Sequence, residues 1–408
     1  MVEKNRVAKT GNEAMAEAMR QINPDVVAAY PITPATEIVQ IFSQFVSDGI
    51  VRTEFVAVES EHSAMSATIG ASAAGSRAMT ATSSQGLALM HEMLYIAAAL
   101  RLPIVMPEVN RALSAPINIH CDHSDTMGSR DAGWIQLFSE NSQEAYDNLI
   151  QAVKIAEKAY LPVMVTIDGF IISHAMEDIK ILTDDEVQKY IGEFNPAYKL
   201  LDTDKPITVG ALDFTDFYFE HKRSQSDATR KSKEIVLKVS TEFSQKYGGN
   251  YSFFESYKLD DAEMAVIVLG STAGTAKVAV DRLRDKGVKA GLLKIRMFRP
   301  FPEAEISQAL SKLKAVAVMD RSESMNGIGG PVFEEIRSAL YDNESKPQVM
   351  NVIYGLGGRD IFVEDIEGIF STLQDIISTG KVSEKVQYVG VRDNCNIKGG
   401  SILEPSVK

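Results

Sequence analysis

Cysteine is scarce in this chain of 408 residues: only Cys121 and Cys395 are present, far apart in the sequence. An iron–sulfur cluster usually takes four thiolates, and a structural zinc site takes closely spaced Cys and His ligands, so the sequence predicts neither group in this chain. The segment HCDH at 120–123 places two histidines, a cysteine and an aspartate side by side. Because such crowding on a loop more often serves packing and hydrogen bonding, we predict no metal site there.

Long hydrophobic runs are also missing. No apolar run approaches the ~20 residues that span a bilayer, which predicts a chain without a membrane span. The first residues, MVEKNRVAKTGNEAM, lack the apolar core of a signal peptide, and we therefore expect a cytoplasmic protein. Positive charge is in the minority, since the net charge is −13. Nucleic acid and anionic membranes are accordingly poor partners for the surface as a whole.

The common phosphate-binding motifs are absent too. Three glycine-rich stretches occur, GSTAGTA from Gly270, NGIGGP from Asn326 and YGLGGRD from Tyr354. None has the spacing of the dinucleotide fingerprint or a Walker lysine, so we interpret all three as tight structural turns. The Gly-Asp-Gly signature, which holds magnesium and diphosphate in thiamine diphosphate enzymes, is also missing.

What is present is a regular alternation of strand and helix patterns. Short runs rich in β-branched residues predict strands at 25–30, 55–58, 77–82, 103–109 and 162–167. Helical patterns lie between them, at 35–46, 61–74, 86–100 and 143–160. This order predicts an α/β fold with a parallel sheet covered by helices on both faces. Functional residues in such folds lie at the carboxyl ends of the strands.

The composition changes after residue 182. Residues 183–258 are polar and rich in Asp, Lys and Ser, which predicts a variable excursion with surface helices that leads to a boundary. The alternation of strands and helices restarts with AEMAVIVLGST at 262–272. We therefore expect two domains, a larger α/β domain over 1–258 and a smaller α/β domain over 259–408.

One stretch places acids where a protein interior does not favour them. VESEHSAMSATIGASAAGSR at 58–77 brings Glu59 and Glu61 to the start of a helix of very small residues. Small residues let a helix pack closely, and a carboxylate in such a place costs several kcal/mol unless it finds a partner. Glu61 is therefore a candidate functional group, although a carboxylate at a helix N-terminus is also stabilised by the helix dipole.

Several long motifs together resemble one family, the 2-oxoacid:ferredoxin oxidoreductases. In the first half the motifs are AAYPITPATE, VESEHSAMSATIGASAAG, TATSSQGLALMHEMLYIAAALRLPIVM, NRALSAP, DHSD and RDAGWIQL. In the second half they are LLKIRMFRPFPEAEI, AVMDRSESMNGIGGPVFEEI and YGLGGRD. The order and spacing are most similar to the α subunit of the pyruvate-specific branch. The resemblance covers nearly the whole chain apart from 183–255.

The resemblance implies an enzyme that decarboxylates a 2-oxoacid oxidatively with thiamine diphosphate. The acyl group would pass to coenzyme A, and electrons would pass through [4Fe-4S] clusters to ferredoxin or flavodoxin. In this family the cofactor lies between chains: the α chain supplies the half facing the aminopyrimidine, and a β subunit supplies the half that binds Mg²⁺ and diphosphate. Ferredoxin-like γ and δ subunits complete the family's complex. It also implies a pyrimidine-type cofactor domain followed by a transketolase C-terminal-like domain.

Three residues carry over from the family as catalytic or substrate-binding groups. Glu61 matches the glutamate that hydrogen-bonds N1′ of the aminopyrimidine and favours its imino tautomer. Arg111 and Thr33 match a pair that binds the 2-oxoacid, because a guanidinium can take a carboxylate in bidentate fashion and a hydroxyl can donate beside it. From the residues alone, Arg111 could equally form a surface ion pair and Thr33 a turn.

Other residues are expected to line the cofactor pocket. These residues follow the first and third strands: Pro31, Ile32, Ser84, Gln85 and Gly86. A helix N-cap explains the serines equally well. His62, beside Glu61, could shuttle protons but more often such a histidine acts indirectly. No role is evident for the loop 122–125.

Other readings stay open at this point. The acid could be 2-oxoisovalerate, an aryl glyoxylate or 2-oxoglutarate instead of pyruvate. The chain could be a non-catalytic structural subunit, or a transketolase-like enzyme without electron transfer. Cysteine clusters in partner chains would distinguish an oxidoreductase.

Overall fold

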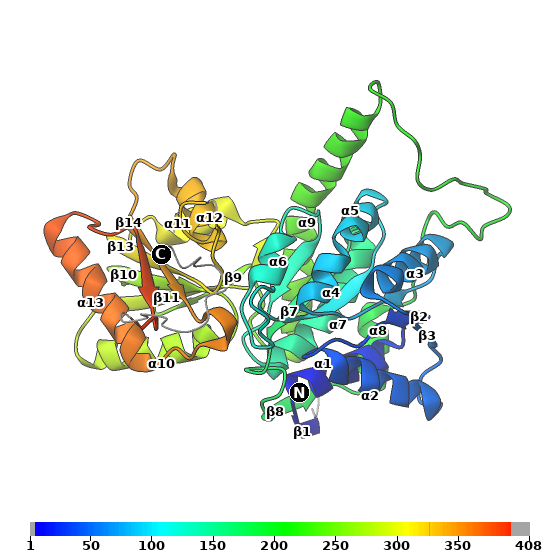
Figure 1. The fold of residues 1–408 in the computed structure, drawn as a ribbon, viewed down its shortest axis with the longest axis horizontal. Helices are drawn as coiled ribbons and strands as arrows, with labels where there is room; N and C mark the ends of the chain where they lie inside the picture. The colour runs from blue at the N-terminus through cyan, green and yellow to red at the C-terminus, as the bar shows by residue number, and fades with distance from the viewer. Residues whose placement is uncertain (1–4, 326, 393–408) are drawn as a thin grey trace, which may run out of the picture.

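The fold is described here from a computed structural model, which covers residues 5–325 and 327–392. Two sheets lie side by side, each sandwiched between helices (Figure 1). No helix in the described ranges is both long and apolar enough to cross a membrane. Two residues named above, Asn326 and Cys395, lie outside the described residues.

The first sheet has seven strands in the order β12-β6-β7-β5-β4-β2-β3. All neighbours are parallel except β12 and β6. Its strands are β2 (Val26–Ala29), β3 (Glu54–Ala57), β4 (Ala78–Met79), β5 (Val105–Asn110), β6 (Ile135–Phe138), β7 (Val163–Asp168) and β12 (Met297–Arg299). A separate antiparallel pair joins β1 (Asn5–Lys9) to β8 (Glu177–Ile181).

Helices cover both faces of this sheet, as predicted. One core joins the sheet to α1 (Gly11–Ile22), α2 (Thr36–Ser47), α7 (Ser142–Ala159), α8 (Asp184–Ile191) and the carboxyl-terminal half of α9 (Tyr218–Tyr247). A second core on the other face contains α3 (Glu61–Ala74), α4 (Ser84–Leu89) and α5 (His91–Ala99). The short helix α6 (Ser124–Gly128) packs beside α4. Burial of these apolar faces, at roughly 25 cal/mol per Å², supplies the main driving force for the layered arrangement.

The second sheet has six strands in the order β15-β14-β13-β10-β11-β9. These strands are β9 (Phe254–Tyr257), β10 (Met264–Val268), β11 (Ala290–Ile295), β13 (Ala315–Asp320), β14 (Gln348–Tyr354) and β15 (Val386–Val389). Helices α10 (Thr272–Asp285) and α13 (Val363–Thr379) cover one face, and α11 (Glu303–Leu310) and α12 (Pro331–Leu340) cover the other. A short 3₁₀ turn, η1 (Leu356–Gly358), follows β14.

The chain crosses between the two sheets more than once. Strand β9 pairs antiparallel with β11 in the second sheet, although it precedes β10. Strand β12, which follows β11 after a single residue, pairs instead with β6 at the edge of the first sheet. The two sheets are therefore linked by strand β12 as well as by side-chain contacts.

The predicted pattern agrees with the structure in most elements and differs in several, among them strand β6, which was not predicted. The five predicted strands of the first sheet are confirmed, and the helix predicted at 61–74 is α3. The helix predicted at 86–100 is two helices, because Met90 interrupts it. Within 183–258 the structure holds the 30-residue helix α9, whose Val236, Val239 and Phe243 are fully buried. The carboxyl-terminal half of α9 is therefore part of the core. The sequence pattern did not predict this, because the apolar residues of that half lie among many lysines.

The other half of α9 is unlike the rest of the molecule. Figure 1 shows its first turns and much of the loop before it standing clear of the body, although the loop starts with hydrogen bonds from Ala197 to Tyr160 and from Leu200 to Ala73. Large apolar side chains are exposed along this arm, which we define as residues 196–224: Tyr198, Leu201, Leu212, Phe214, Phe217 and Phe219. Such a concentration of exposed apolar surface is unusual for a free monomer.

Candidate active site

The carboxyl ends of four adjacent parallel strands bring the predicted residues to one edge of the first sheet. The segment from Pro31 to Thr33 follows β2, and Glu61 follows β3. Ser84 follows β4, and Arg111 follows β5 directly. Because β3, β2, β4 and β5 are neighbours in this order, loops far apart in the sequence meet at that edge.

Glu61 is the first residue of α3. The helix begins here because the Ser60 hydroxyl accepts a hydrogen bond from the Ser63 N–H, and it ends at Gly75, which adopts φ 110°. Glu61 as a residue is only 7% exposed. Within the described part of the chain its carboxylate takes part in no hydrogen bond or ion pair. A buried carboxylate of this kind lacks the partner that would offset its desolvation.

Gly86 makes room for that carboxylate. A Cβ at position 86 would lie 2.8 Å from Oε1 of Glu61 and 2.3 Å from Oγ1 of Thr82. The Thr82 hydroxyl is also fully buried and has no hydrogen-bond partner among the described residues. The start of α4 therefore approaches Glu61 closely only because residue 86 has no side chain. Two unpartnered polar groups at one cradle fit a polar heterocycle such as an aminopyrimidine.

Arg111 and Thr33 are brought together as the substrate-pair hypothesis requires. Nη1 of Arg111 donates to the backbone carbonyl of Thr33 at 2.9 Å, and Nε donates to that of Asn118 at 3.0 Å. Burial lowers the pKa of Arg111, and the nearby Asp125 opposes that shift. The guanidinium keeps its charge, because its ordinary pKa lies far above neutrality.

Asp125 connects the two halves of the site, although in the sequence only its place in DHSD marked it. Its Oδ2 accepts the backbone N–H of Arg111 at 2.8 Å and that of Ser84 at 3.1 Å. Its Oδ1 accepts from Asn110 and Thr126. One buried carboxylate therefore fixes both the Arg111 loop and the start of α4.

The remaining predicted residues occupy varied positions. Ser84 is buried, with φ at 50°, and its hydroxyl lies within hydrogen-bond distance of two acceptors, the Ala112 carbonyl at 2.8 Å and Gln85 Oε1 at 2.7 Å. The Ser83 hydroxyl likewise donates to Val109, so neither serine caps the helix with its side chain. Pro31 is exposed and Ile32 is half-buried at the end of β2. His62 points toward Glu92, 3.7 Å away, and makes no contact with Glu61 that would suit a proton shuttle.

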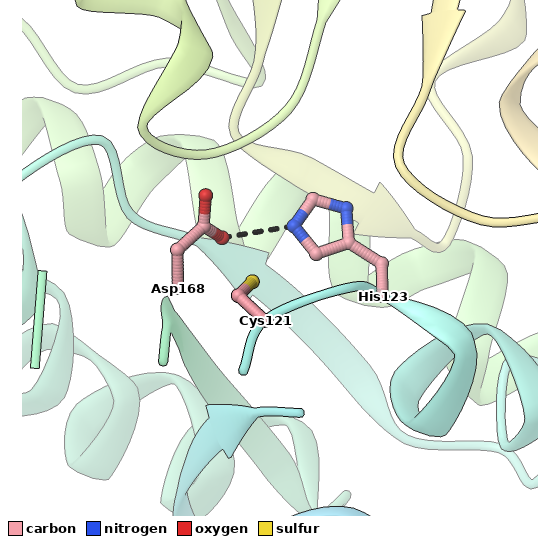
Figure 2. A group of neighbouring side chains, drawn as sticks. All are labelled: Cys121, His123 and Asp168. Atoms are coloured by element: carbon pink, nitrogen blue, oxygen red, sulfur yellow. Dashed lines mark hydrogen bonds and ion pairs between the residues drawn. The ribbon is translucent and has the colours of Figure 1, made fainter. Parts of the chain in front are cut away.

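A second buried polar cluster lies at the carboxyl end of β7 (Figure 2). Cys121, His123 and Asp168 bring their ligand-type atoms within 4.8 Å of one another. Nε2 of His123 lies 2.8 Å from Oδ1 of Asp168, and the Arg321 guanidinium lies 3.3 Å from Oδ2. A buried guanidinium at this distance disfavours a cation, so the geometry assigns the cluster to an interdomain ion-pair network.

Charge in this network stays on Asp168. Burial by itself would raise the pKa of Asp168, but His123 and Arg321 outweigh it and lower the pKa below its usual range. Burial similarly raises the pKa of the Cys121 thiol, which leaves it protonated. The thiol is therefore poorly suited to be either a nucleophile or a ligand.

The glycine-rich turns make contacts within the chain. The turn at Gly270 directs the Ser271 N–H to Asp168 at 3.1 Å, so a carboxylate of the chain occupies the place that a phosphate would take. At the start of α12, Asp320 accepts the N–H groups of Val332 and Phe333. The third turn contacts the first domain, where Gly357 donates to Asp122.

Comparisons with known proteins agree with this geometry. Residues 17–241 match the family model described as pyruvate flavodoxin/ferredoxin oxidoreductase, thiamine diphosphate-binding, and residues 262–366 match pyruvate:ferredoxin oxidoreductase core domain II. The pyruvate synthase subunit PorA of Thermotoga maritima is 55% identical over 95% of this chain and 98% of its own length. The ketoisovalerate oxidoreductase subunit VorA of Pyrococcus abyssi is 42% identical over 95% of this chain and 99% of its own.

A solved structure shares the fold. The 2-oxoglutarate:ferredoxin oxidoreductase of Magnetococcus marinus, solved with 2-oxoglutarate, coenzyme A and succinyl-CoA bound, superposes with a TM-score of 0.70 at 22% identity. The match covers 91% of this chain, which spans 65% of the length of that chain. The resemblance found in the sequence motifs is thereby confirmed, and the chain belongs to the pyruvate flavodoxin/ferredoxin oxidoreductase family.

Proposed function

We propose that this chain is the α subunit of a pyruvate:ferredoxin oxidoreductase and supplies the aminopyrimidine half of its thiamine diphosphate site. The complex would convert pyruvate and coenzyme A to acetyl-CoA and CO₂ and pass the electrons to ferredoxin or flavodoxin. The observation that carries the proposal is Glu61, a buried carboxylate without a described partner, set against the cradle at Gly86.

The cofactor, when bound, supplies the electron sink that decarboxylation of a 2-oxoacid needs. Glu61 would share a proton with the ring nitrogen of the aminopyrimidine, a task that suits a carboxylate shielded from water. Gly86 and the Ser84–Gln85 turn would form one wall of the pocket. Pro31 and Ile32 would form the wall across from it, at the end of the neighbouring strand β2.

Arg111 and Thr33 would bind the 2-oxoacid. In the described part of the chain, Nη2 of Arg111 donates to no group, so this nitrogen is available to a substrate carboxylate. Two carbonyl contacts hold the guanidinium in place beforehand, which reduces the entropy lost on binding. The hydroxyl of Thr33, an exposed residue, could donate beside it.

Pyruvate is favoured over 2-oxoisovalerate by similarity to the relatives. The Thermotoga maritima pyruvate synthase subunit is 55% identical, against 42% for the Pyrococcus abyssi ketoisovalerate subunit. Two pyruvate synthase subunits from Pyrococcus species are also 42–43% identical. The preference for pyruvate therefore rests on the 55% identity to the Thermotoga maritima subunit alone. The wall residues that would exclude a branched acid come partly from the partner subunit in this proposal.

The rest of the machinery would come from other chains of the complex, in the cytoplasm. A β subunit would supply Mg²⁺ and the diphosphate contacts, since this chain has no Gly-Asp-Gly, and γ and δ subunits would hold the [4Fe-4S] clusters. The exposed apolar arm at 196–224 is typical of a surface covered in an assembly.

The test is activity of the assembled enzyme. The chain would be purified with its native partners, and coenzyme A-dependent viologen reduction would be measured across pyruvate, 2-oxoisovalerate, an aryl glyoxylate and 2-oxoglutarate. We expect the highest kcat/KM with pyruvate. A higher kcat/KM with another acid would identify that acid, and not pyruvate, as the substrate. If no acid supported viologen reduction, the structural-subunit hypothesis would be favoured. The isolated chain should be colourless and inactive.

A further inference from the structure

Glu108 is a buried acid in the middle of strand β5 that the proposed chemistry does not use. Its side chain is fully buried, and no hydrogen-bond donor is well placed at either of its oxygens among the described residues. Thr82 pairs with it on one side and Thr166 on the other, and their hydroxyls are also buried without partners. An ionised carboxylate in this row would lack the donors that buried charges need.

Besides burial, the groups that act on the pKa of Glu108 are the Asp125 carboxyl, which raises it, and the Ser84 N–H, which lowers it. The two carboxyls differ sharply in their surroundings. Asp125 accepts four hydrogen bonds, from the backbone of Ser84, Arg111 and Thr126 and from the Asn110 amide. Asn110 lies two residues after Glu108 on the same strand, so its amide faces the same side of the sheet. Donors gathered at one carboxyl stabilise its charge, and the other carboxyl must then hold the proton.

We propose that Glu108 is a positioning residue, which stays a neutral carboxylic acid and donates a hydrogen bond to the Asp125 carboxylate. The bond fixes the Asp125 carboxylate, which in turn holds the N–H groups of Arg111 and Ser84. Glu108 thereby sets the distance between the substrate-binding arginine and the start of α4 without touching either ligand. Its effect on catalysis rests on the proposed function, whereas the acid pair itself does not.

The electrostatics agree with this assignment. Burial and the neighbouring Asp125 raise the pKa of Glu108 well above its usual range. Burial raises the pKa of Asp125 less, because its donors and Glu108 counteract the shift. Of the two carboxyls, Glu108 is therefore the one that these effects favour as the holder of the proton and the donor.

Two substitutions separate a neutral donor from an ionised carboxylate. Glu108→Gln keeps a neutral donor of the same length, and Glu108→Leu removes the donor at similar volume. In the assembled enzyme we expect Glu108→Gln to stay within about threefold of wild type in the KM for pyruvate. Glu108→Leu should raise that KM about tenfold, with the KM for coenzyme A nearly unchanged, because a buried charge loses a donor. Thr166→Val is the matched control, since it alters the same buried row but leaves the acid pair intact.

Infrared spectroscopy detects whether Glu108 is protonated, and this measurement does not depend on enzyme activity. The wild-type enzyme at neutral pH should show the C=O stretch of a buried neutral carboxylic acid, absent from Glu108→Gln and retained in Thr166→Val. The proposal is overturned if that band is missing from the wild-type enzyme. It is also overturned if Glu108→Gln raises the KM for pyruvate as much as Glu108→Leu does, or if Glu108→Leu keeps the wild-type KM. A complex with the band but no turnover of any 2-oxoacid would instead remove the proposed function and leave the acid pair standing.

Discussion

Nη1 of Arg111 donates a hydrogen bond to the backbone carbonyl of Thr33, at 2.9 Å, although the two residues are 78 positions apart. The contact joins the loop after β5 to the loop after β2, across the intervening strand β4. Because Arg111 holds the backbone of Thr33 and not its hydroxyl, the side chains of both residues remain available to a ligand. This arrangement separates the effects of substitutions at the two positions.

Substitution of Arg111 should affect the 2-oxoacid and not coenzyme A. Arg111→Lys keeps the charge but loses the planar fork and its two carbonyl contacts, and should raise the KM for pyruvate. Arg111→Ala should raise it further, by about 10- to 100-fold, since a charge-assisted hydrogen bond contributes about 1.5–3 kcal/mol. Steady-state kinetics of the assembled enzyme measure both constants. A change confined to the KM for coenzyme A would mean that Arg111 belongs to the coenzyme A-binding site and not to the 2-oxoacid site.

Thr33→Val should act in the same direction and more weakly. Valine keeps the backbone carbonyl that accepts from Arg111 and deletes only one neutral donor, which is worth about 0.5–1.5 kcal/mol. The expected rise in KM for pyruvate is therefore about tenfold or less, with normal thermal stability. An effect as large as that of Arg111→Ala would mean that the hydroxyl, and not the guanidinium, dominates binding.

Glu61→Gln should abolish most activity and preserve assembly. An amide has the same shape but cannot share the proton, so kcat should fall about 100-fold or more. Glu59→Gln is the matched control, because Glu59 is fully exposed and its carboxylate accepts a hydrogen bond from the nearby Ser63 hydroxyl. Its activity should stay close to wild type. Near-normal turnover in the assembled Glu61→Gln enzyme would exclude Glu61 from the mechanism.

Gly86→Ala tests the close approach of α4 to Glu61. The added Cβ would lie 2.3 Å from Thr82 Oγ1 and 2.8 Å from Glu61 Oε1, so α4 or both side chains must move. We expect kcat/KM to fall at least tenfold while the chain remains folded. Gly70→Ala, on α3 itself, meets no atom within 4 Å and should raise helix stability slightly. Equal activity in the two variants would show that the cradle at Gly86 is not needed.

Asp168→Asn should weaken the link between the two sheets. The substitution leaves the buried Arg321 guanidinium without this counter-charge and gives His123 an uncharged partner, which costs about 3–5 kcal/mol in the free energy of unfolding. The folded-state pKa of Asp168 is lowered, so its contribution is present above the unfolded pKa of about 4 and is lost as the pH falls through and below that value. Urea unfolding at pH 7 and between pH 5 and 3 measures this. The variant should be less stable at pH 7 and lose less stability on acidification, and parallel pH curves would contradict the assignment.

The elements that could be predicted are those whose start and end are marked by residues in the local sequence. Helix α3 was predicted to the residue because Ser60 caps its start and Gly75 ends it, both within the sequence pattern. The grouping of Thr33, Glu61, Ser84 and Arg111 at one edge also followed from the order of the strands, since parallel strands end together. Their individual roles rest on the family resemblance.

Long-range features could not be predicted in this way. Glu108 lies within an apolar strand, and only the fold places Asp125 against it, 17 residues later. The pairing of His123 with Asp168 likewise depends on how two loops meet. Strand β12 showed no sign of leaving the sheet of β11, because a strand pattern specifies a period of two and not a partner.

The positions of strands β9 and β12 at the edges of the two sheets bear on how the chain folds. A fragment ending at residue 258 would carry β9 without its sheet and would leave β6 as an open edge, which invites pairing with other chains. A fragment starting at 259 would lack β9 and leave β11 open in turn. Neither half is then an independent folding unit, so the chain should melt in one cooperative transition in spite of its two sheets. Synthesis must also reach beyond Arg299 before the first sheet can close.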